Sequence, residues 1–267
     1  MDILSQIIAQ KRQRVDSAKN ADPIEALREQ AIAARATAKP HALRDALKNE
    51  RINIIAEFKR RSPSKGPIKE NADAATIARS YQSAGAAAIS VLTEENYFGG
   101  SLDDLREVRR TVTIPVLRKD FTFDEYQVYE TAVAKADALL LIVAALDDET
   151  LARLLRLTED ELEMDALVEV HTKEEMFRAV AVGAKLIGVN NRDLHTFSVS
   201  VETSVELAPF APAESILISE SGLDPSAVRK LRAIGYKGFL VGEALMRAED
   251  HEGELRNFND QVPETIA

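Results

Sequence analysis

Short apolar runs alternate with amphipathic segments along most of the chain. From residue 52 onward there are eight such runs, and each is followed by a polar or glycine-containing turn and then by apolar residues at helical spacing. The runs cover residues 52–57, 87–92, 114–119, 137–143, 165–170, 185–190, 215–219 and 237–241. This alternation predicts an α/β fold, a closed (β/α)₈ TIM barrel. An open doubly wound sheet usually carries a Gly-x-Gly-x-x-Gly turn after its first strand, and that turn is absent here.

The first 48 residues precede this repeat and lack strand signals. Ile3, Ile7 and Val15 recur at helical spacing. Asp22-Pro23 restarts a helix, because proline fits the first helical turn, and a third short helix is expected at about residues 41–49. We therefore expect a single domain over 1–267, composed of an N-terminal helical extension (1–48), the barrel (49–250) and a C-terminal tail (251–267).

Capping residues mark several helix starts within the repeat. Ser101 and Thr172 are each followed three residues later by an acidic residue, which is typical of a capping box. Asp224 places a cap before a proline in the first turn.

Composition narrows the possible functional classes. The 267 residues include no cysteine, which excludes disulfides, thiolate metal sites and cysteine nucleophiles. The four histidines are scattered, so we expect no metal centre. The formal net charge of −10 argues against a nucleic-acid partner. No apolar run reaches the roughly 18 residues of a membrane span, and the N-terminus lacks signal-peptide features. We expect a cytoplasmic protein with no membrane partner, either a monomer or a weak dimer.

Polar side chains gather at the ends of the predicted strands, where barrels of this class build their active sites. Glu57 and Lys59 are two positions apart, so they share one face of the chain at the strand's exit. Lys119 and Glu169 end apolar strands, where a buried charge requires a partner. A single polar residue at a strand end is commonly solvated, but six such ends on one rim favour a binding site.

Two features predict an anionic ligand. An acidic protein needs a local positive region to attract an anion, and residues 59–65 supply four cations, of which Arg60 and Arg61 are expected to be solvated. Ser221-Gly222 and Gly242-Glu243 follow the seventh and eighth strands, where barrels commonly bind phosphate through backbone N–H groups. Glycine allows the backbone to approach an anion closely, and a short helix is expected at 243–246.

Several motifs, taken in chain order, resemble those of the indole-3-glycerol-phosphate synthases. They are IAEFKRRSPSKG at 55–66, SVLTE at 90–94, YFGGS at 97–101, PVLRKDF at 115–121, LVEVH at 167–171, GVNNRDL at 188–194 and SESG at 219–222. The resemblance covers about residues 50–250, and the helical extension is also similar to that of the family. It implies a (β/α)₈ barrel of tryptophan biosynthesis that converts 1-(2-carboxyphenylamino)-1-deoxyribulose 5-phosphate into indole-3-glycerol phosphate, CO₂ and water. It implies no metal or organic cofactor.

The resemblance also implies catalytic roles. Lys119 matches the family's general acid at the substrate ketone, and Glu169 matches the glutamate that takes or returns protons during the loss of water. Lys59 corresponds to the lysine that pairs with the substrate carboxylate, and some mechanisms give it a proton transfer as well. Lys119 and Glu169 are expected to face each other across the barrel mouth, as acid and base on opposite sides of the substrate ring.

The same resemblance assigns the supporting residues. Glu57 and Asn190 are implied to hold the lysines and the substrate hydroxyls, and Ser219 lies at the family's serine of the seventh strand. Phe98 and Phe121 are implied to flank the aromatic ring, although ordinary loop packing also accounts for them. The remaining implied pocket residues are Ser62, Arg192, Glu220, Ser221, Gly222, Gly242 and Glu243.

One departure and two alternatives stay open at this point. The loop after the eighth strand reads VGEA at 241–244, where some relatives carry serine or threonine, so a phosphate there must rely on backbone N–H donors with the Glu243 carboxylate turned away. Another phosphate-binding barrel enzyme, either similar to phosphoribosylanthranilate isomerase or a Schiff-base aldolase using Lys119, is the alternative among enzymes. A non-catalytic anion-binding barrel is the alternative outside them. Borohydride trapping with a ketose phosphate distinguishes the aldolase, which becomes labelled at a lysine.

Overall fold

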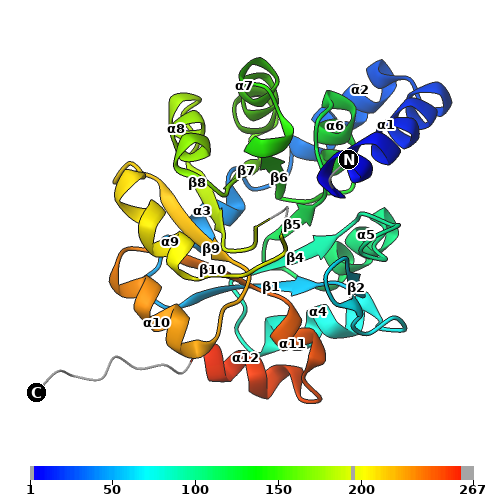
Figure 1. The fold of residues 1–267 in the computed structure, drawn as a ribbon. Helices are drawn as coiled ribbons and strands as arrows, with labels where there is room; N and C mark the ends of the chain where they lie inside the picture. Colours follow the sequence, from blue (N-terminus) through cyan, green and yellow to red (C-terminus); the bar gives the residue numbers. More distant parts are fainter. Residues whose placement is uncertain (1–2, 194–195, 260–267) are drawn as a thin grey trace, which may run out of the picture.

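Eight parallel strands close into a barrel in the computed structural model, which describes residues 3–193 and 196–259 (Figure 1). Neighbouring strands follow the order β1-β10-β9-β8-β7-β6-β5-β4, and β4 pairs with β1 to complete the circle. The strands are β1 Asn53–Phe58, β4 Ala88–Leu92, β5 Val116–Lys119, β6 Ala138–Ile142, β7 Asp165–Val170, β8 Leu186–Asn190, β9 Ile216–Glu220 and β10 Gly238–Val241. All eight predicted runs are confirmed, with ends that differ by at most two residues.

Each barrel strand is followed by a helix that covers the outside of the barrel (Figure 1). These helices are α4 Ala74–Ser83, α5 Leu102–Thr111, α6 Glu125–Val133, α7 Asp148–Arg156, α8 Lys173–Ala181, α9 Glu202–Leu207, α10 Pro225–Ala233, α11 Glu243–Arg247 and α12 His251–Asn259. Ser101, Thr172 and Asp224 each accept a hydrogen bond from a backbone N–H in the first turn of α5, α8 and α10. The three predicted helix starts are therefore confirmed.

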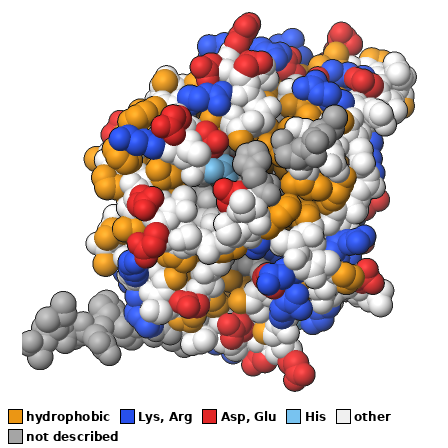
Figure 2. Space-filling model, in the orientation of Figure 1, with side chains coloured by type: hydrophobic (Ala, Val, Ile, Leu, Met, Phe, Trp, Pro, Cys, Tyr) orange, Lys and Arg blue, Asp and Glu red, His pale blue; other side chains and the backbone are white. Residues whose placement is uncertain are grey.

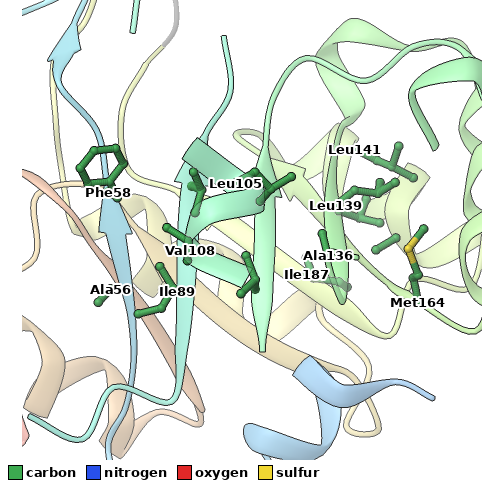
Figure 3. Close-up of a cluster of buried hydrophobic side chains, with 14 of the residues drawn as sticks. Ala56, Phe58, Ile89, Leu105, Val108, Ala136, Leu139, Leu141, Met164 and Ile187 are labelled. Atoms are coloured by element: carbon green, nitrogen blue, oxygen red, sulfur yellow. The ribbon is translucent and has the colours of Figure 1, made fainter. Parts of the chain in front are cut away.

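Strand side chains alternate between an outer and an inner layer, because successive residues of a strand point to opposite faces. The outer layer packs against the helices; Figure 3 shows Leu105 and Val108 of α5 beside Ile89 of β4. The inner layer fills the barrel with residues such as Ile55, Leu117 and Leu167. Strands buried on both faces are mostly apolar, which explains why apolar runs located them.

The N-terminal extension consists of α1 Ile3–Ala21, α2 Ile24–Arg35 and α3 Ala42–Ala46. Helices α1 and α2 lie beside α6 (Figure 1). Leu43 and Leu47, in and directly after α3, are fully buried in the inner apolar layer, and the backbone N–H of Arg44 donates to Asp165 at the start of β7. Helix α3 therefore closes the end of the barrel at which the strands begin.

Two segments differ from the expectation. Residues 59–67, which carry four cations and which we call the basic segment, contain a small antiparallel hairpin, β2 Arg61–Ser62 with β3 Gly66–Pro67. The first part of the expected tail is a helix, α12, rather than a free tail. This helix packs against the barrel, where its Leu255 and Phe258 are buried. Residues 260–267 of that tail, together with Leu194 of the GVNNRDL motif and His195, lie outside the described residues. Within the described part of the chain, no helix is long and apolar enough to cross a membrane.

Candidate active site

Four charged side chains point into the barrel where the strands end. Each lies two positions after a residue of the inner apolar layer, so its side chain points into the barrel as the side chain of that residue does. We call these residues the charged layer: Glu57 on β1, Lys119 on β5, Glu169 on β7 and Glu220 on β9. The barrel therefore changes from an apolar filling to a charged one at its C-terminal end.

A cavity of about 720 Å³ opens above the charged layer. Every site residue predicted from the sequence lines it except Ser219. Ile3, Leu4 and Ile7 of α1 add an apolar wall that the sequence did not predict. Figure 2 shows acidic and basic side chains interspersed over the face that carries the mouth of the barrel. Among the described residues, no cluster of acidic or histidine side chains could hold a metal ion.

Lys119 lies between two carboxylates of the charged layer. Its Nζ donates to Glu169 Oε2 at 2.8 Å and lies 3.1 Å from Glu220 Oε2. Burial on its own lowers the pKa of Lys119, but the two carboxylates outweigh burial and raise this pKa above its ordinary value. Lys119 is therefore an ammonium group at neutral pH. The expectation that Lys119 and Glu169 face each other across the barrel mouth is wrong, because β6 alone separates their strands and both side chains point towards the barrel axis.

Glu169 and Glu220 differ in how many donors they receive. Glu169 contacts Lys119, accepts a bond from Asn190 Nδ2 at 3.2 Å, and lies 3.3 Å from His171 Nε2. Burial raises the pKa of Glu169, but Lys119 and His171 outweigh burial and hold this pKa below its ordinary value. Among the residues that the structure describes, Glu220 pairs with Lys119 alone and its Oε1 is buried without a partner. Burial raises the pKa of Glu220 to about 7. Of these two neighbouring carboxyl groups, Glu169 therefore favours the ionised form and Glu220 favours the protonated form.

Glycines make room for the charged layer. A Cβ on Gly188 would lie 2.2 Å from Glu220 Oε1, and a Cβ on Gly242 would lie 2.4 Å from Glu57 Oε1. Glu57 accepts a 2.6 Å bond from Lys59 Nζ, which confirms that these two side chains share a face. Gly242 therefore has a steric role beside this ion pair, whether or not it also approaches a phosphate.

The rim of the cavity is built by loops. The rings of Phe98 and Phe121 lie 6.2 Å apart with planes at 41°. Arg192 reaches across the mouth and donates to Ser64 at 3.1 Å. Arg60 is not solvated as expected: it makes two bonds of 2.6 and 2.7 Å to Asp104, which fixes the start of the basic segment against α5.

Ser219 is turned away from the cavity. Its neighbours Ile218 and Glu220 point into the barrel, so Ser219 points outward, where it is fully buried and its hydroxyl contacts Asn191 Nδ2 at 3.0 Å and Ser204 Oγ at 2.8 Å. The sequence prediction ended this strand at Ser219, whereas β9 continues to Glu220. The prediction that Ser219 belongs to the site is wrong for this reason, and Glu220 joins the charged layer rather than the phosphate loop alone. Ser221, with a φ of 68°, turns the chain into the loop.

Two further groups, which the sequence did not predict, contact the site residues. His171 lies two positions after Glu169, and this spacing could have identified it. Asp120, next to Lys119, is buried and bonded to Lys11 of α1 at 3.0 Å and to Arg118 at 3.1 Å. Burial raises the pKa of Asp120, but these cations outweigh burial and lower it to about 2. This network ties α1 to the end of β5, beside Lys119.

Comparison with known proteins identifies close relatives by sequence. A family model described as indole-3-glycerol phosphate synthase matches residues 4–258. The indole-3-glycerol phosphate synthase of Bacteroides thetaiotaomicron is 46% identical over 258 residues, which cover 96% of this chain and 97% of the relative. That of Carboxydothermus hydrogenoformans is 45% identical over 253 residues, covering 92% and 96% of the two chains.

Solved structures of lower identity share the fold. The 3-hexulose-6-phosphate synthase of Salmonella typhimurium has a TM-score of 0.63 at 12% identity, covering 78% of this chain and 97% of its own. Thiamine phosphate pyrophosphorylase from Pyrococcus furiosus has a TM-score of 0.58 at 16% identity, covering 80% and 96%. At these identities the likeness concerns the barrel alone.

Proposed function

The chain belongs to the indole-3-glycerol phosphate synthase family, and we propose that the charged layer is where it performs the family's reaction. It is a carboxy-lyase of tryptophan biosynthesis, which converts 1-(2-carboxyphenylamino)-1-deoxyribulose 5-phosphate into indole-3-glycerol phosphate, CO₂ and water. The observation that carries the proposal is the contact of Lys119 with both Glu169 and Glu220 at the floor of the cavity.

The substrate's three functional regions match three parts of the cavity wall. Lys59 already pairs with the carboxylate of Glu57, and we propose that it also binds the substrate carboxylate. Phe98 and Phe121 offer apolar faces for the aromatic ring. We propose that the backbone N–H groups around Gly222 and Gly242 donate hydrogen bonds to the substrate phosphate. Because Glu243 accepts a 3.1 Å bond from Arg247, its carboxylate is neutralised by a cation beside the phosphate loop.

Ring closure requires an acid at the ketone. Attack of the aryl carbon on the ketone breaks aromaticity and leaves an alkoxide, and loss of CO₂ restores the aromatic ring. Lys119 donates the proton that the alkoxide accepts. To do so its ammonium group leaves one of its two carboxylates, and the ketone oxygen takes the place of that carboxylate.

Dehydration needs both an acid and a base. The new hydroxyl leaves as water after accepting a proton, and the adjacent carbon loses a proton to a base, for which we propose Glu169. The whole reaction therefore takes up two protons and releases one. Glu220, with a pKa of about 7, can hold a proton at neutral pH and return it to Lys119, which it contacts.

Lys119→Met tests this assignment. The variant keeps the volume of the side chain and loses its proton, so we expect turnover to fall by at least about 10³-fold while product binding persists. Turnover is followed by the indole absorbance that forms from the synthetic substrate, and product binding by titration calorimetry. A variant with near-normal kcat would contradict the general-acid role.

The remaining expectations concern the protein outside the site. We propose a single domain over 1–267, with the division at 48 given above and with α12 counted as part of the barrel. We also propose a cytoplasmic location, and a monomer or weak dimer that binds neither nucleic acid nor membrane. The net charge of −10 supports the absence of a nucleic-acid partner. Light scattering across a concentration series measures the oligomeric state.

A further inference from the structure

A chain of three side chains runs from the charged layer to a second cavity. His171 Nε2 lies 3.3 Å from Glu169 Oε1, and His171 Nδ1 lies 3.1 Å from Glu175 Oε2. Glu175 is fixed in turn, because it lies in the first turn of α8 and its Oε2 accepts a 2.7 Å bond from the backbone N–H of His171. We propose that His171 is a positioning residue, which holds the Glu169 carboxylate in place when Lys119 turns from it to the substrate.

The need for this residue follows from the geometry of Lys119. In the free protein, Lys119 binds Glu169 Oε2, and the proposed general-acid step removes this contact. Glu169 is 2% exposed, and a buried carboxylate that loses its cation tends to take up a proton or move. His171 and Asn190 both approach the other oxygen, Oε1, so neither contact depends on where Lys119 points. Of these two, only His171 can carry a charge.

The surroundings favour the protonated imidazole. Burial lowers the pKa of His171, but Glu169 and Glu175 outweigh burial and raise it to about 10. On its other side, His171 lines the second cavity, of about 660 Å³ between α1 and the loops after β6, β7 and β8, where the other charged groups are Arg12, Glu175, Arg192 and Asp193. His171 is therefore a second cation beside Glu169. If its side chain is removed, a small molecule that enters this cavity can occupy the space of the imidazole.

The test compares His171→Gln and Glu175→Gln with the wild-type protein. This inference rests on the proposed role of Glu169, so Glu169→Gln is measured alongside. We expect His171→Gln to lower kcat by roughly tenfold with a nearly unchanged KM, because the interaction acts on the reacting state. Loss of the cation also raises the pKa of Glu169, so the acid limb of the kcat profile should move up by about 1 pH unit. Glu175→Gln should produce smaller changes in the same direction.

A readout beyond activity separates positioning from mere packing. In His171→Ala, added imidazole should restore part of the lost kcat, since the second cavity leaves room for it. Ser198→Ala is the matched control: Ser198 lines the same cavity and its hydroxyl bonds Thr196, so kcat and the pH profile should stay as in the wild type. Thermal unfolding of all variants checks that each remains folded.

Three results would overturn the inference. If His171→Gln keeps the wild-type kcat and pH profile while Glu169→Gln is inactive, His171 has no positioning role although Glu169 keeps its own. A lower kcat with an unmoved acid limb and no response to imidazole would make His171 a packing residue. If Glu169→Gln itself retains full turnover, the proposed role of Glu169 fails and the inference fails with it.

Discussion

Replacing Glu220 by glutamine tests which carboxyl group of the charged layer holds a proton near neutral pH. Among the described residues, Glu169 accepts hydrogen bonds from Lys119 and Asn190 and lies 3.3 Å from His171 Nε2, whereas Glu220 contacts Lys119 alone and has a buried Oε1 without a partner. The proton should therefore reside on Glu220, whose pKa burial raises to about 7. Glutamine keeps the shape of the side chain and cannot titrate.

The magnitude follows from linkage between protonation and folding. Between the ordinary pKa of 4.5 and about 7, the folded chain keeps a proton that the unfolded chain has released. The resulting stabilisation is fully present below pH 4.5 and is lost as the pH rises through the folded pKa. At about 1.4 kcal/mol per pH unit, the free energy of unfolding loses roughly 3 kcal/mol over this window. The Glu220→Gln variant should lack this loss.

The assay is urea unfolding of both proteins from about pH 4.5 to about pH 8, followed by circular dichroism. The difference between the two free energies of unfolding removes the contribution of all other groups, and it should shift by about 3 kcal/mol in favour of the variant as the pH rises. Glu243→Gln, which removes a partly exposed carboxylate at the rim, is the matched control. Parallel pH curves for wild type and Glu220→Gln would refute the reasoning. Loss of the slope in Glu169→Gln instead would assign the proton to Glu169.

Three further predictions concern the surroundings of Lys119. Gly188→Ala places a Cβ 2.2 Å from Glu220 Oε1 and so displaces this carboxylate, so kcat should fall at least tenfold with an unchanged circular dichroism spectrum, and a kcat within twofold of wild type would contradict this. Lys11→Met leaves Asp120 with one buried cation fewer, so urea unfolding should give a loss of about 3 kcal/mol, and an unchanged midpoint would show that the bond contributes nothing. Ser219→Ala should cost about 1 kcal/mol and leave kcat as it is, since the hydroxyl faces α9; a large loss of kcat would restore Ser219 to the site.

The fold could be predicted from the sequence because the strands are buried on both faces. Continuous apolar runs such as ALLLI at 138–142 locate these strands without any knowledge of their neighbours. The hairpin of β2 and β3 could not be found this way, because its strands have two residues each and no apolar pattern. Helix α12 escaped for a related reason: Leu255 and Phe258 are isolated apolar residues in a polar segment, and only the barrel surface beside them makes them a buried face.

The site was predictable wherever a residue's direction follows from its own strand. The spacing of Glu57 and Lys59 sufficed to place them on one face, and the same argument, applied to Ile218 and Glu220, identifies Glu220 and excludes Ser219. Contacts between distant segments are a different matter. Arg60 was expected to be solvated, and its partner Asp104 lies on α5, far from the loop of Arg60 in the sequence. The contact of Lys119 with Glu169 depends likewise on how closely the strands converge around the barrel axis.

The glycines of the site show why a residue's role cannot be assigned from its own chemistry alone. Gly242 was predicted to let the backbone approach a phosphate, and Gly188 appeared only within a motif. Neither has a positive φ, so backbone conformation does not require glycine at either position. What requires glycine is the volume of Glu220 and of the Glu57–Lys59 pair, which occupy the space that a Cβ would fill. The carboxylates of Glu220 and Glu57 fit inside the barrel because Gly188 of β8 and Gly242, directly after β10, contribute no side chain beside them, so the glycines and the carboxylates they accommodate act as one steric unit.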